Sequence, residues 1–338
     1  MFDFIPDYVF LLIFGFILLI KGGDWFVDAA TGIAKRFKLP ELLIGATVVS
    51  IGTTLPEVMT SAIGAASGSG AMAYGNAIGS IVCNTSLIAA LTVAIKPAKA
   101  ERKSLIFPVC FFFGVAAFYA LNAYIGGKFA LWMGITLLVG FVVYMIINVL
   151  NMKKDPASEE HSDEPLECEL PETASKIGLI KDIVILAVSA FIIAVGAYLL
   201  VDSATLIAEG LGVPDTVISL TIVALGTSLP ELVTAITSLL KGHGALSLGN
   251  IIGSNIFNLV LVSGAAITIN PFDVPADATF LGQNASFIFD IPLVFLTMGI
   301  LTIPTLLTGK LKRWQGISLL TLYVSYCVLQ FAIIPNFA

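Results

Sequence analysis

The sequence predicts an all-α integral membrane protein with ten transmembrane helices in two inverted-topology five-helix repeats, and with broken helices at the midplane of the membrane. Three observations support this prediction. Of the 338 residues, 57% are hydrophobic and 12% are charged, whereas soluble domains have about 25% charged residues. Ten apolar stretches are long enough to cross a bilayer. A motif that combines Gly, Pro and Glu occurs twice, with Glu57 and Glu231 standing 174 positions apart.

Each apolar stretch is close to the roughly 20 residues that carry an α-helix across a hydrocarbon core of about 30 Å. The ten stretches lie at 8–34, 42–66, 72–95, 104–122, 129–150, 178–208, 216–240, 245–269, 285–307 and 315–334. The first is expected to stay in the mature protein, because the residues before it carry no positive charge and no small-residue cleavage site follows it. The four cysteines have no zinc-type or CxxC spacing, so they predict neither a metal site nor a disulfide framework.

Lys and Arg residues in short loops predict the orientation of the chain, because they concentrate on the cytoplasmic side of a membrane. With ten spans, fifteen of the seventeen fall on one side: Lys35, Arg36, Lys38, Lys96, Lys99, Arg102, Lys103, Lys153, Lys154, Lys176, Lys181, Lys241, Lys310, Lys312 and Arg313. The exceptions are Lys128, on the opposite side, and Lys21, inside the first span. We therefore expect a multi-pass protein of the plasma membrane with both termini outside.

The second half of the chain repeats the first at a constant offset, without gaps. Besides the two glutamates, the matched pairs are Asp28 with Asp202, Pro40 with Pro214, Thr47 with Thr221, and GNAIGS from Gly75 with GNIIGS from Gly249. Five spans separate equivalent positions, so the second copy crosses the membrane in the opposite direction, as in many secondary transporters. The expected units are a first repeat with helices 1–5 (1–151), an acidic cytoplasmic linker (152–177) and a second repeat with helices 6–10 (178–338). The linker is interpreted as a solvated connection; weak attraction of cations is the alternative.

Gly and Pro interrupt an apolar helix in both copies of the motif, VSIGTTLPEVMTSA from Val49 and VALGTSLPELVTAI from Val223. These residues weaken or remove helix hydrogen bonds, and irregular backbone in a bilayer is tolerated only where it is buried in protein or lines a cavity. We expect both helices to unwind at 50–54 and 224–228 and to present carbonyl oxygens there. Four hydroxyl groups accompany them, from Thr53, Thr54, Thr227 and Ser228.

Glu57 and Glu231 directly follow the two prolines. A charged residue within a membrane helix costs a few kcal/mol, so it indicates a functional site by default. The alternatives are a protonated Glu that hydrogen-bonds across helices and a side chain that reaches to the membrane interface. Recurrence beside two interrupted helices favours function.

The next helix of each half carries a polar face, because Ser80 and Asn84, like Ser254 and Asn258, are four residues apart. The alternative is a packing seam of small residues with ordinary interhelical hydrogen bonds. Four glycines have the same spacing: Gly75 with Gly79 and Gly249 with Gly253. We expect the glycines to allow close approach and the polar pairs to reach the site.

The expected site therefore offers only oxygen ligands. Such a set suits Ca²⁺, whereas Zn²⁺ or Cu⁺ prefers His or Cys and Mg²⁺ gives up its water reluctantly. Both histidines, His161 and His243, lie in expected loops. Two ionised carboxylates would be neutralised by one Ca²⁺, by two Na⁺ or by protons. An empty ionised pocket is costly to occlude, which favours exchange over leak.

The motif pairs GTTLPE with GNAIGSIVCN and GTSLPE with GNIIGSNIFN resemble the paired alpha-repeats of the sodium/calcium exchanger family, within the cation/calcium antiporter superfamily. The resemblance covers nearly the whole chain and implies ten helices in two inverted halves. It implies that Glu57 and Glu231 are shared Ca²⁺ and Na⁺ ligands and that the carbonyls of Thr53 and Thr227 bind Ca²⁺. It implies further Na⁺ ligands at Thr54, Ser80, Asn84, Ser228, Ser254 and Asn258, with carbonyls near Ser50 and Ala224.

The resemblance also implies that the first helix of each half, near 8–34 and 178–208, slides as a gate. Within the first helix, Lys21 and Asp24 are three residues apart, a spacing that allows them to pair. Asp28 recurs in the second half without such a partner. Packing at the helix end is the preferred interpretation for these acids, ahead of gating.

The sequence thus predicts a secondary active antiporter that exchanges Na⁺ for Ca²⁺ by alternating access, is not an enzyme and needs no cofactor. Its expected partners are Ca²⁺, Na⁺ and membrane lipid, with no nucleic acid and no protein partner evident. An exchanger of H⁺ for Ca²⁺, or for another divalent cation, is the alternative, because protons can neutralise the same carboxylates. A cation channel fits the inverted repeat less well, and an intramembrane hydrolase lacks a His that pairs with Ser or Asp within the spans.

Overall fold

The computed structural model describes residues 5–37, 39–154, 175–210, 224–276, 279–280 and 283–333. Most of the expected acidic linker lies outside the described residues, and so do residues 211–223, which precede the second motif.

The described chain is almost entirely helical. In the first half the elements are α1 (Ile5–Arg36), α2 (Glu41–Ile44), the π-helix η1 (Gly45–Val49), α3 (Ser50–Ala66), α4 (Gly70–Cys83), the π-helix η2 (Asn84–Ala89), α5 (Ala90–Ile95), α6 (Arg102–Gly126), β1 (Lys128–Phe129) and α7 (Leu131–Lys154). In the second half they are α8 (Ser175–Gly210), α10 (Ala224–Thr227), α11 (Leu229–Leu240), α12 (Gly244–Phe257), the π-helix η5 (Asn258–Val262), α13 (Ser263–Ile269), β2 (Phe272–Asp273), β3 (Thr279–Phe280), β4 (Gln283–Asn284), the π-helix η6 (Ser286–Asp290), α14 (Ile291–Thr308) and α15 (Arg313–Ile333).

Eight of the described helical segments are long and apolar enough to cross a membrane. They correspond to the first six, the eighth and the ninth of the expected spans, so the helical membrane fold is confirmed. The seventh expected span, 216–240, is described only from Ala224 onward, and the tenth corresponds to α15. The count of ten spans stays a prediction.

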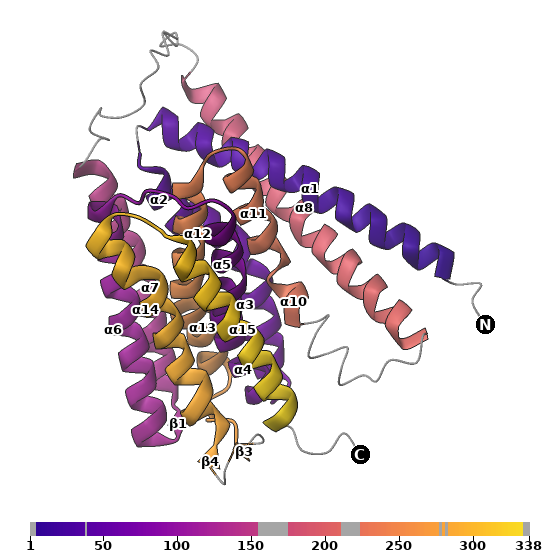
Figure 1. Ribbon diagram of the computed structural model, residues 1–338, viewed down its shortest axis with the longest axis vertical. Helices are drawn as coiled ribbons and strands as arrows, with labels where there is room; N and C mark the ends of the chain where they lie inside the picture. Colours follow the sequence, from indigo (N-terminus) through magenta and orange to yellow (C-terminus); the bar gives the residue numbers. More distant parts are fainter. Residues whose placement is uncertain are drawn as a thin grey trace.

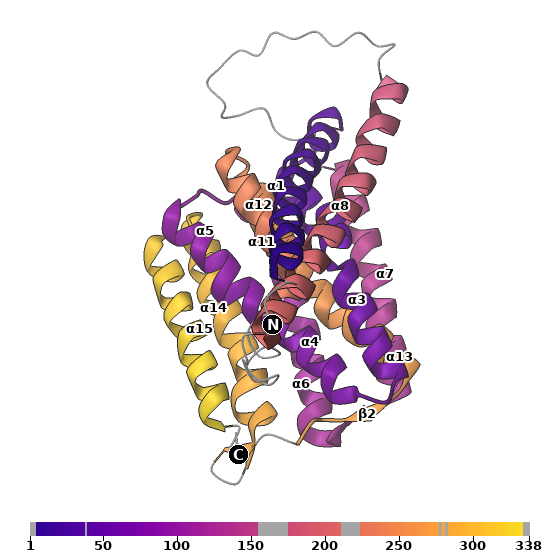
Figure 2. The same ribbon diagram turned by 90° about the vertical axis from the view of Figure 1, so that its right-hand side faces the viewer.

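The long helices α1 and α8 form an antiparallel pair that runs obliquely beside a bundle of the other helices (Figure 1). Figure 2 shows α5, α14 and α15 on one side of this pair and α3, α7 and α13 on the other. The centre of the bundle is α12, which packs against η1, α3, α6 and α11. Its span, Gly244–Ile269, is the most buried of the eight.

The connections that carry most of the positive charge meet at one end of the bundle. Leu311 N donates to Ala98 O over 2.8 Å, and Ala100 N donates to Gly309 O over 3.0 Å. At the opposite end, β1 pairs with the antiparallel strand β2; Figure 1 labels β1 and Figure 2 labels β2 at this end. The separation of the basic loops from the Lys128 loop is therefore present in the fold, whereas the orientation of these ends in a membrane stays a prediction.

Equivalent helices of the two halves have matching bounds. Both ends of α4 and α12 differ by the 174-residue offset of the motifs, and a π-helix follows each of them at Asn84 and Asn258. α4 begins beside Phe272 of β2, whereas α12 begins beside Ala98, at the opposite end of the bundle. The two helices therefore run in opposite directions.

The expected unwinding at residues 50–54 is wrong. α3 runs without interruption from Ser50 through Pro56 to Ala66, and the irregular turn lies upstream, in η1. A proline removes one N–H group, which leaves the carbonyl of Gly52 without its helical partner, but contacts with neighbouring helices can support such a helix in a membrane protein.

The second motif is broken, but only at Ser228; the expected unwinding at 224–227 is wrong, because these residues form the short helix α10. α10 ends at Thr227, α11 begins at Leu229, and Ser228 lies between them in a non-helical conformation. Pro230 stands in the first turn of α11, a position where the missing N–H group costs little.

Candidate cation-binding site

Two glycines bring α12 against the helix that leads into the first motif. A Cβ added at Gly253 would collide with the Ser50 hydroxyl and the backbone of Ala46, and one added at Gly249 would collide with the backbone of Leu42. Because only residues without a side chain permit this approach, the expected close seam is confirmed for these two glycines.

The seam expected for Gly75 and Gly79 stays a prediction. Among the described residues, no atom lies within 4 Å of a Cβ added at either position. The equivalent glycines of the second half pack against the segment 41–49. The 174-residue offset makes 215–223 the segment that corresponds to 41–49, and it lies outside the described residues.

Ser50, Thr53 and Asn250 form a buried cluster of hydroxyl and amide groups at the seam. Ser50 Oγ donates to Asn250 O over 3.0 Å, and Thr53 Oγ1 donates to Asn250 Oδ1 over 3.2 Å. Sequence reasoning missed Asn250. A signal was present, because Asn250 stands four residues before Ser254 in the repeated motif and so shares its helix face.

Glu231 lies in the first turn of α11 and receives hydroxyl groups from both halves. Thr54 Oγ1 donates to Glu231 Oε1 over 3.3 Å, and Ser254 Oγ donates to the same oxygen over 3.4 Å. The two hydroxyl oxygens are 3.1 Å apart. The first turn of a helix favours a negative charge, because its backbone N–H groups have no partner within the helix. α3, α11 and α12 thus meet at one carboxylate.

Glu57 adds a second carboxylate, from the middle of α3. Glu57 and Glu231 are both fully buried and are close enough to interact electrostatically. Both oxygens of Glu57 and Oε2 of Glu231 have no hydrogen-bond partner among the described residues. Two buried carboxylates repel each other when ionised, so this pair needs a proton or a cation to be stable.

Four more of the expected ligands are buried: Ser80, Asn84, Ser228 and Asn258. The amide groups of Asn84 and Asn258 and the hydroxyl of Ser228 have no partner in the described part of the chain. Each asparagine is the first residue of a π-helix, a feature that is frequent at functional sites and that no sequence pattern indicated. A buried polar group without a partner costs about 1–3 kcal/mol, so these groups fit a site that takes up an ion.

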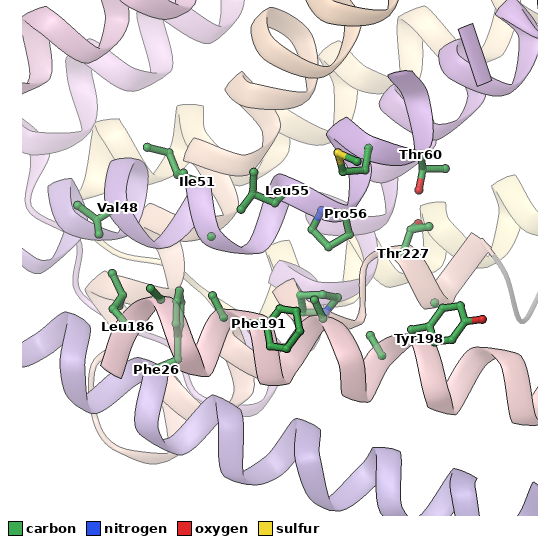
Figure 3. Close-up of a pocket in the computed structure, with 18 of the residues that line it drawn as sticks. Phe26, Val48, Ile51, Leu55, Pro56, Thr60, Leu186, Phe191, Tyr198 and Thr227 are labelled. Carbon is green, nitrogen blue, oxygen red and sulfur yellow. The ribbon is translucent and has the colours of Figure 1, made fainter. Parts of the chain in front are cut away.

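Thr227 lies on the side of the broken helix that faces α8. It lines a cavity of about 720 Å³ between α3, α8 and α10, whose other walls are mostly apolar. Figure 3 shows Thr227 near Thr60, with Phe191 and Tyr198 of α8 across the cavity. Ala224 is the first residue of α10, so its backbone stands one helical turn before the break.

Lys21 and Asp24 do not form the ion pair that their spacing allows. Lys241, at the end of α11, takes this role: its Nζ is 3.5 Å from Asp24 Oδ1 and 2.7 Å from Asp28 Oδ1. The spacing along α1 could not show that a neighbouring helix ends in a lysine beside it. Asp28 therefore has a partner that the sequence did not predict, and this partner links α1 to α11.

Comparisons with known proteins are consistent with this geometry. The family described as sodium/calcium exchanger protein matches residues 8–150 and 181–332. The sodium/calcium exchanger MaX1 of Methanosarcina acetivorans is 32% identical over 96% of this chain and 98% of its own length. The membrane protein MJ0091 of Methanocaldococcus jannaschii is 34% identical over 92% of this chain and 93% of its own.

Solved structures agree with the sequence relatives. The sodium-calcium exchanger NCX_Mj, soaked with 10 mM Na⁺ and zero Ca²⁺, matches this fold with a TM-score of 0.77 and 29% identity, over 96% of this chain and 99% of that chain. The same exchanger soaked with 2.5 mM Na⁺ and 10 mM Sr²⁺ matches with a TM-score of 0.77 and 30% identity, over the same shares of both chains. The present chain therefore belongs to the sodium/calcium exchanger family.

Proposed function

We propose that this chain is a secondary active antiporter that exchanges Na⁺ for Ca²⁺ across the membrane by alternating access. The observation that carries the proposal is the buried pair of Glu57 and Glu231. One glutamate comes from each half, the two interact, and three of their four carboxylate oxygens have no partner among the described residues. The family and the likeness to NCX_Mj support the choice of ions.

In this proposal the two carboxylates are shared ligands of both ions. The carbonyls of Thr53 and Thr227 complete the Ca²⁺ site. Because a carbonyl oxygen has two lone pairs, the carbonyl oxygen of Thr53 can accept a hydrogen bond within the helix and still bind a cation. The proposed Na⁺ ligands are Thr54, Ser80, Asn84, Ser228, Ser254 and Asn258, with carbonyls near Ser50 and Ala224. Asn250 orients Ser50 and Thr53 through its hydrogen bonds.

Charge balance explains why such a site exchanges ions. Two ionised carboxylates carry two negative charges, which one Ca²⁺ or two Na⁺ neutralise. Closing the site around uncompensated charges is expensive, because charged groups are poorly stabilised away from water. The loaded forms can therefore move between the two sides, whereas the empty form is held back, and uptake of one ion is coupled to release of the other.

The proposed architecture is an inverted repeat of ten helices, with 1–151 and 178–338 as its halves and 152–177 as a cytoplasmic linker. The opposite directions of α4 and α12 support it. The end of the bundle with the basic loops is assigned to the cytoplasm of the plasma membrane, with both termini outside. The pair α1 and α8 is the proposed gate, surrounded by lipid, and no covalent chemistry or cofactor is involved.

The test is ⁴⁵Ca²⁺ uptake into proteoliposomes, with Na⁺, H⁺ and K⁺ gradients imposed one at a time. We expect an outward Na⁺ gradient to drive saturable uptake, and a pH gradient of equal size to drive none. Uptake driven by the pH gradient alone would replace the proposal by H⁺/Ca²⁺ exchange. Unsaturable flux that needs no counter-ion would indicate a channel instead.

A further inference from the structure

A third acidic side chain lies in a membrane-length segment, on a different helix from Glu57 and from Glu231. Asp290 is the last residue of η6 and directly precedes α14. It belongs to the membrane-length segment Ser286–Thr308, and it is partly buried. The exchange proposed above does not use this carboxylate.

Hydroxyl groups from three elements approach the Asp290 carboxylate. Tyr326 of α15 donates to Asp290 Oδ1 over 3.3 Å. Ser286, at the start of η6, and Tyr74 of α4 are also close enough to Asp290 to interact with it electrostatically. α14 packs against both α4 and α15, and Figure 1 shows α14 and α15 side by side at the C-terminal end of the chain.

Tyr74 points to a missing ligand. Only 4% of this residue is exposed, and its hydroxyl is buried without a hydrogen-bond partner in the described part of the chain. Its ring stacks on Phe129, with 6.1 Å between the ring centroids, so the hydroxyl cannot turn freely to find water. A buried hydroxyl without a partner costs about 1–3 kcal/mol, and an ion held beside Ser286 and Asp290 would supply the missing interaction.

Ser286 is held in place by the loop before it. Its backbone N donates to Asn284 Oδ1 over 2.9 Å, and its hydroxyl donates to Pro275 O over 3.2 Å. Because the hydroxyl proton is used in this way, the lone pairs of Ser286 Oγ are available to a positively charged ligand.

We propose that Asp290, Tyr74, Ser286 and Tyr326 form a binding site for a monovalent cation such as Na⁺, separate from the exchange site. Every ligand is an oxygen, which suits a hard cation. Among the described residues no three His, Cys, Asp or Glu side chains gather, so no transition-metal site forms here. One carboxylate balances one positive charge, whereas Ca²⁺ would leave an uncompensated charge beside the apolar core.

Such a cation would connect α4, η6 and α15. Asp290 and Tyr326 are partly exposed, whereas Glu57 and Glu231 are fully buried. Binding to the folded state alone raises its stability in proportion to the logarithm of the Na⁺ concentration. The inference does not depend on exchange of Na⁺ for Ca²⁺.

The first test measures equilibrium ²²Na⁺ binding to the full chain carrying Glu57→Gln and Glu231→Gln, which removes the central carboxylates. One saturable site per chain should remain, and adding Asp290→Asn should abolish it. Asp273→Asn is the matched control, because Asp273 is an exposed acid of β2, and it should leave the site intact. Tyr74→Phe should raise the Kd for Na⁺ roughly 5- to 10-fold, since it removes one ligand.

A second readout keeps the proposal testable if the double variant does not fold. In the otherwise unchanged chain, Asp290→Asn should lower the number of bound ²²Na⁺ by one. It should also reduce the rise in Tm produced by NaCl over choline chloride at equal ionic strength. Unchanged ²²Na⁺ binding in the Asp290→Asn variant would overturn the proposal. A Tm that responds to pH but not to Na⁺ at this site would overturn it as well, and would identify Asp290 as a hydrogen-bonded acid only.

Discussion

The two buried glutamates differ in how much they depend on a bound cation. Hydroxyl oxygens of Thr54 and Ser254 lie 3.3 and 3.4 Å from Glu231 Oε1, whereas neither oxygen of Glu57 has a partner among the described residues. A hydrogen bond to a carboxylate stabilises its charged form. We infer that Glu57 needs the cation more than Glu231 does, so the two halves contribute unequally although their motifs match.

Replacing either glutamate by Gln should nearly abolish transport. Glu57→Gln and Glu231→Gln each keep the shape of the side chain but remove one of two charges, and losing one member of a buried charge interaction costs about 3–5 kcal/mol. We expect Na⁺-driven ⁴⁵Ca²⁺ uptake to fall by roughly 100-fold or more. Glu101→Gln is the control, because Glu101 is exposed in a loop. If either buried variant takes up Ca²⁺ nearly as fast as the unchanged chain, the assignment of both glutamates to the site is refuted.

Transport should not require K⁺, because Asn84 and Asn258 are buried and neutral. A third carboxylate would raise the charge of the site from −2 to −3 and create a demand for another cation beside Ca²⁺. Uptake driven by Na⁺ should be the same with K⁺ omitted from both sides as with K⁺ present. Asn258→Asp should lower uptake in the absence of K⁺ and recover part of it when K⁺ is added. Loss of uptake by the unchanged chain without K⁺ would refute the prediction.

At the level of secondary structure, the sequence correctly predicted the features that depend on local residue patterns. The apolar stretches at 72–95 and 245–269 match the spans Gly70–Ile95 and Gly244–Ile269 within two residues, because length and hydrophobicity decide such spans. The spacing of Ser254 and Asn258 likewise predicted their shared burial.

Features that depend on tertiary contacts were not predictable in the same way. Both π-helices begin at the equivalent asparagine of the repeated motif, Asn84 and Asn258, but no known residue pattern predicts a π-helix there. The unwinding predicted for the first motif was wrong, because a single proline does not break a helix whose neighbours support it. The partner of Asp28 is a lysine from a helix more than 200 positions away, and only the fold brings the two together.

The seam between α12 and the first motif should not tolerate a single added methyl group. Gly253→Ala places a Cβ against the Ser50 hydroxyl and the backbone of Ala46. Overpacking of this kind costs about 1–3 kcal/mol, so we expect a lower Tm of the purified protein and slower Ca²⁺ uptake. Gly114→Ala is the matched control, since nothing lies within 4 Å of a Cβ added in the middle of α6. Equal Tm values for the two variants would mean that the helices do not approach as closely as described.

At the scale of the whole molecule, one ion pair joins α1 to α8, and another joins this pair of helices to the bundle. Arg36 Nη2 lies 3.1 Å from Asp182 Oδ2, which ties α1 to α8. Lys241 reaches α1 through Asp28 and so ties the pair to α11. If α1 and α8 move together as the proposed gate, the first contact can persist while the second has to break. All four side chains are partly exposed, so each pair contributes little energy, and motion of the pair is not prevented.

Cysteine labelling should place the two ends of the bundle on opposite sides of the membrane. In a background whose four native cysteines are replaced by Ala, Gly126→Cys tests the end near β1 and Glu101→Cys tests the end with the basic loops. Both positions are exposed. Because the basic loops should face the cytoplasm, a membrane-impermeant maleimide added to intact cells should label Gly126→Cys at once and Glu101→Cys only after permeabilisation. Both variants should react fully in detergent, which controls for accessibility. The reverse pattern would invert the orientation but keep the fold, whereas labelling of both from one side would contradict the placement of these connections at opposite ends.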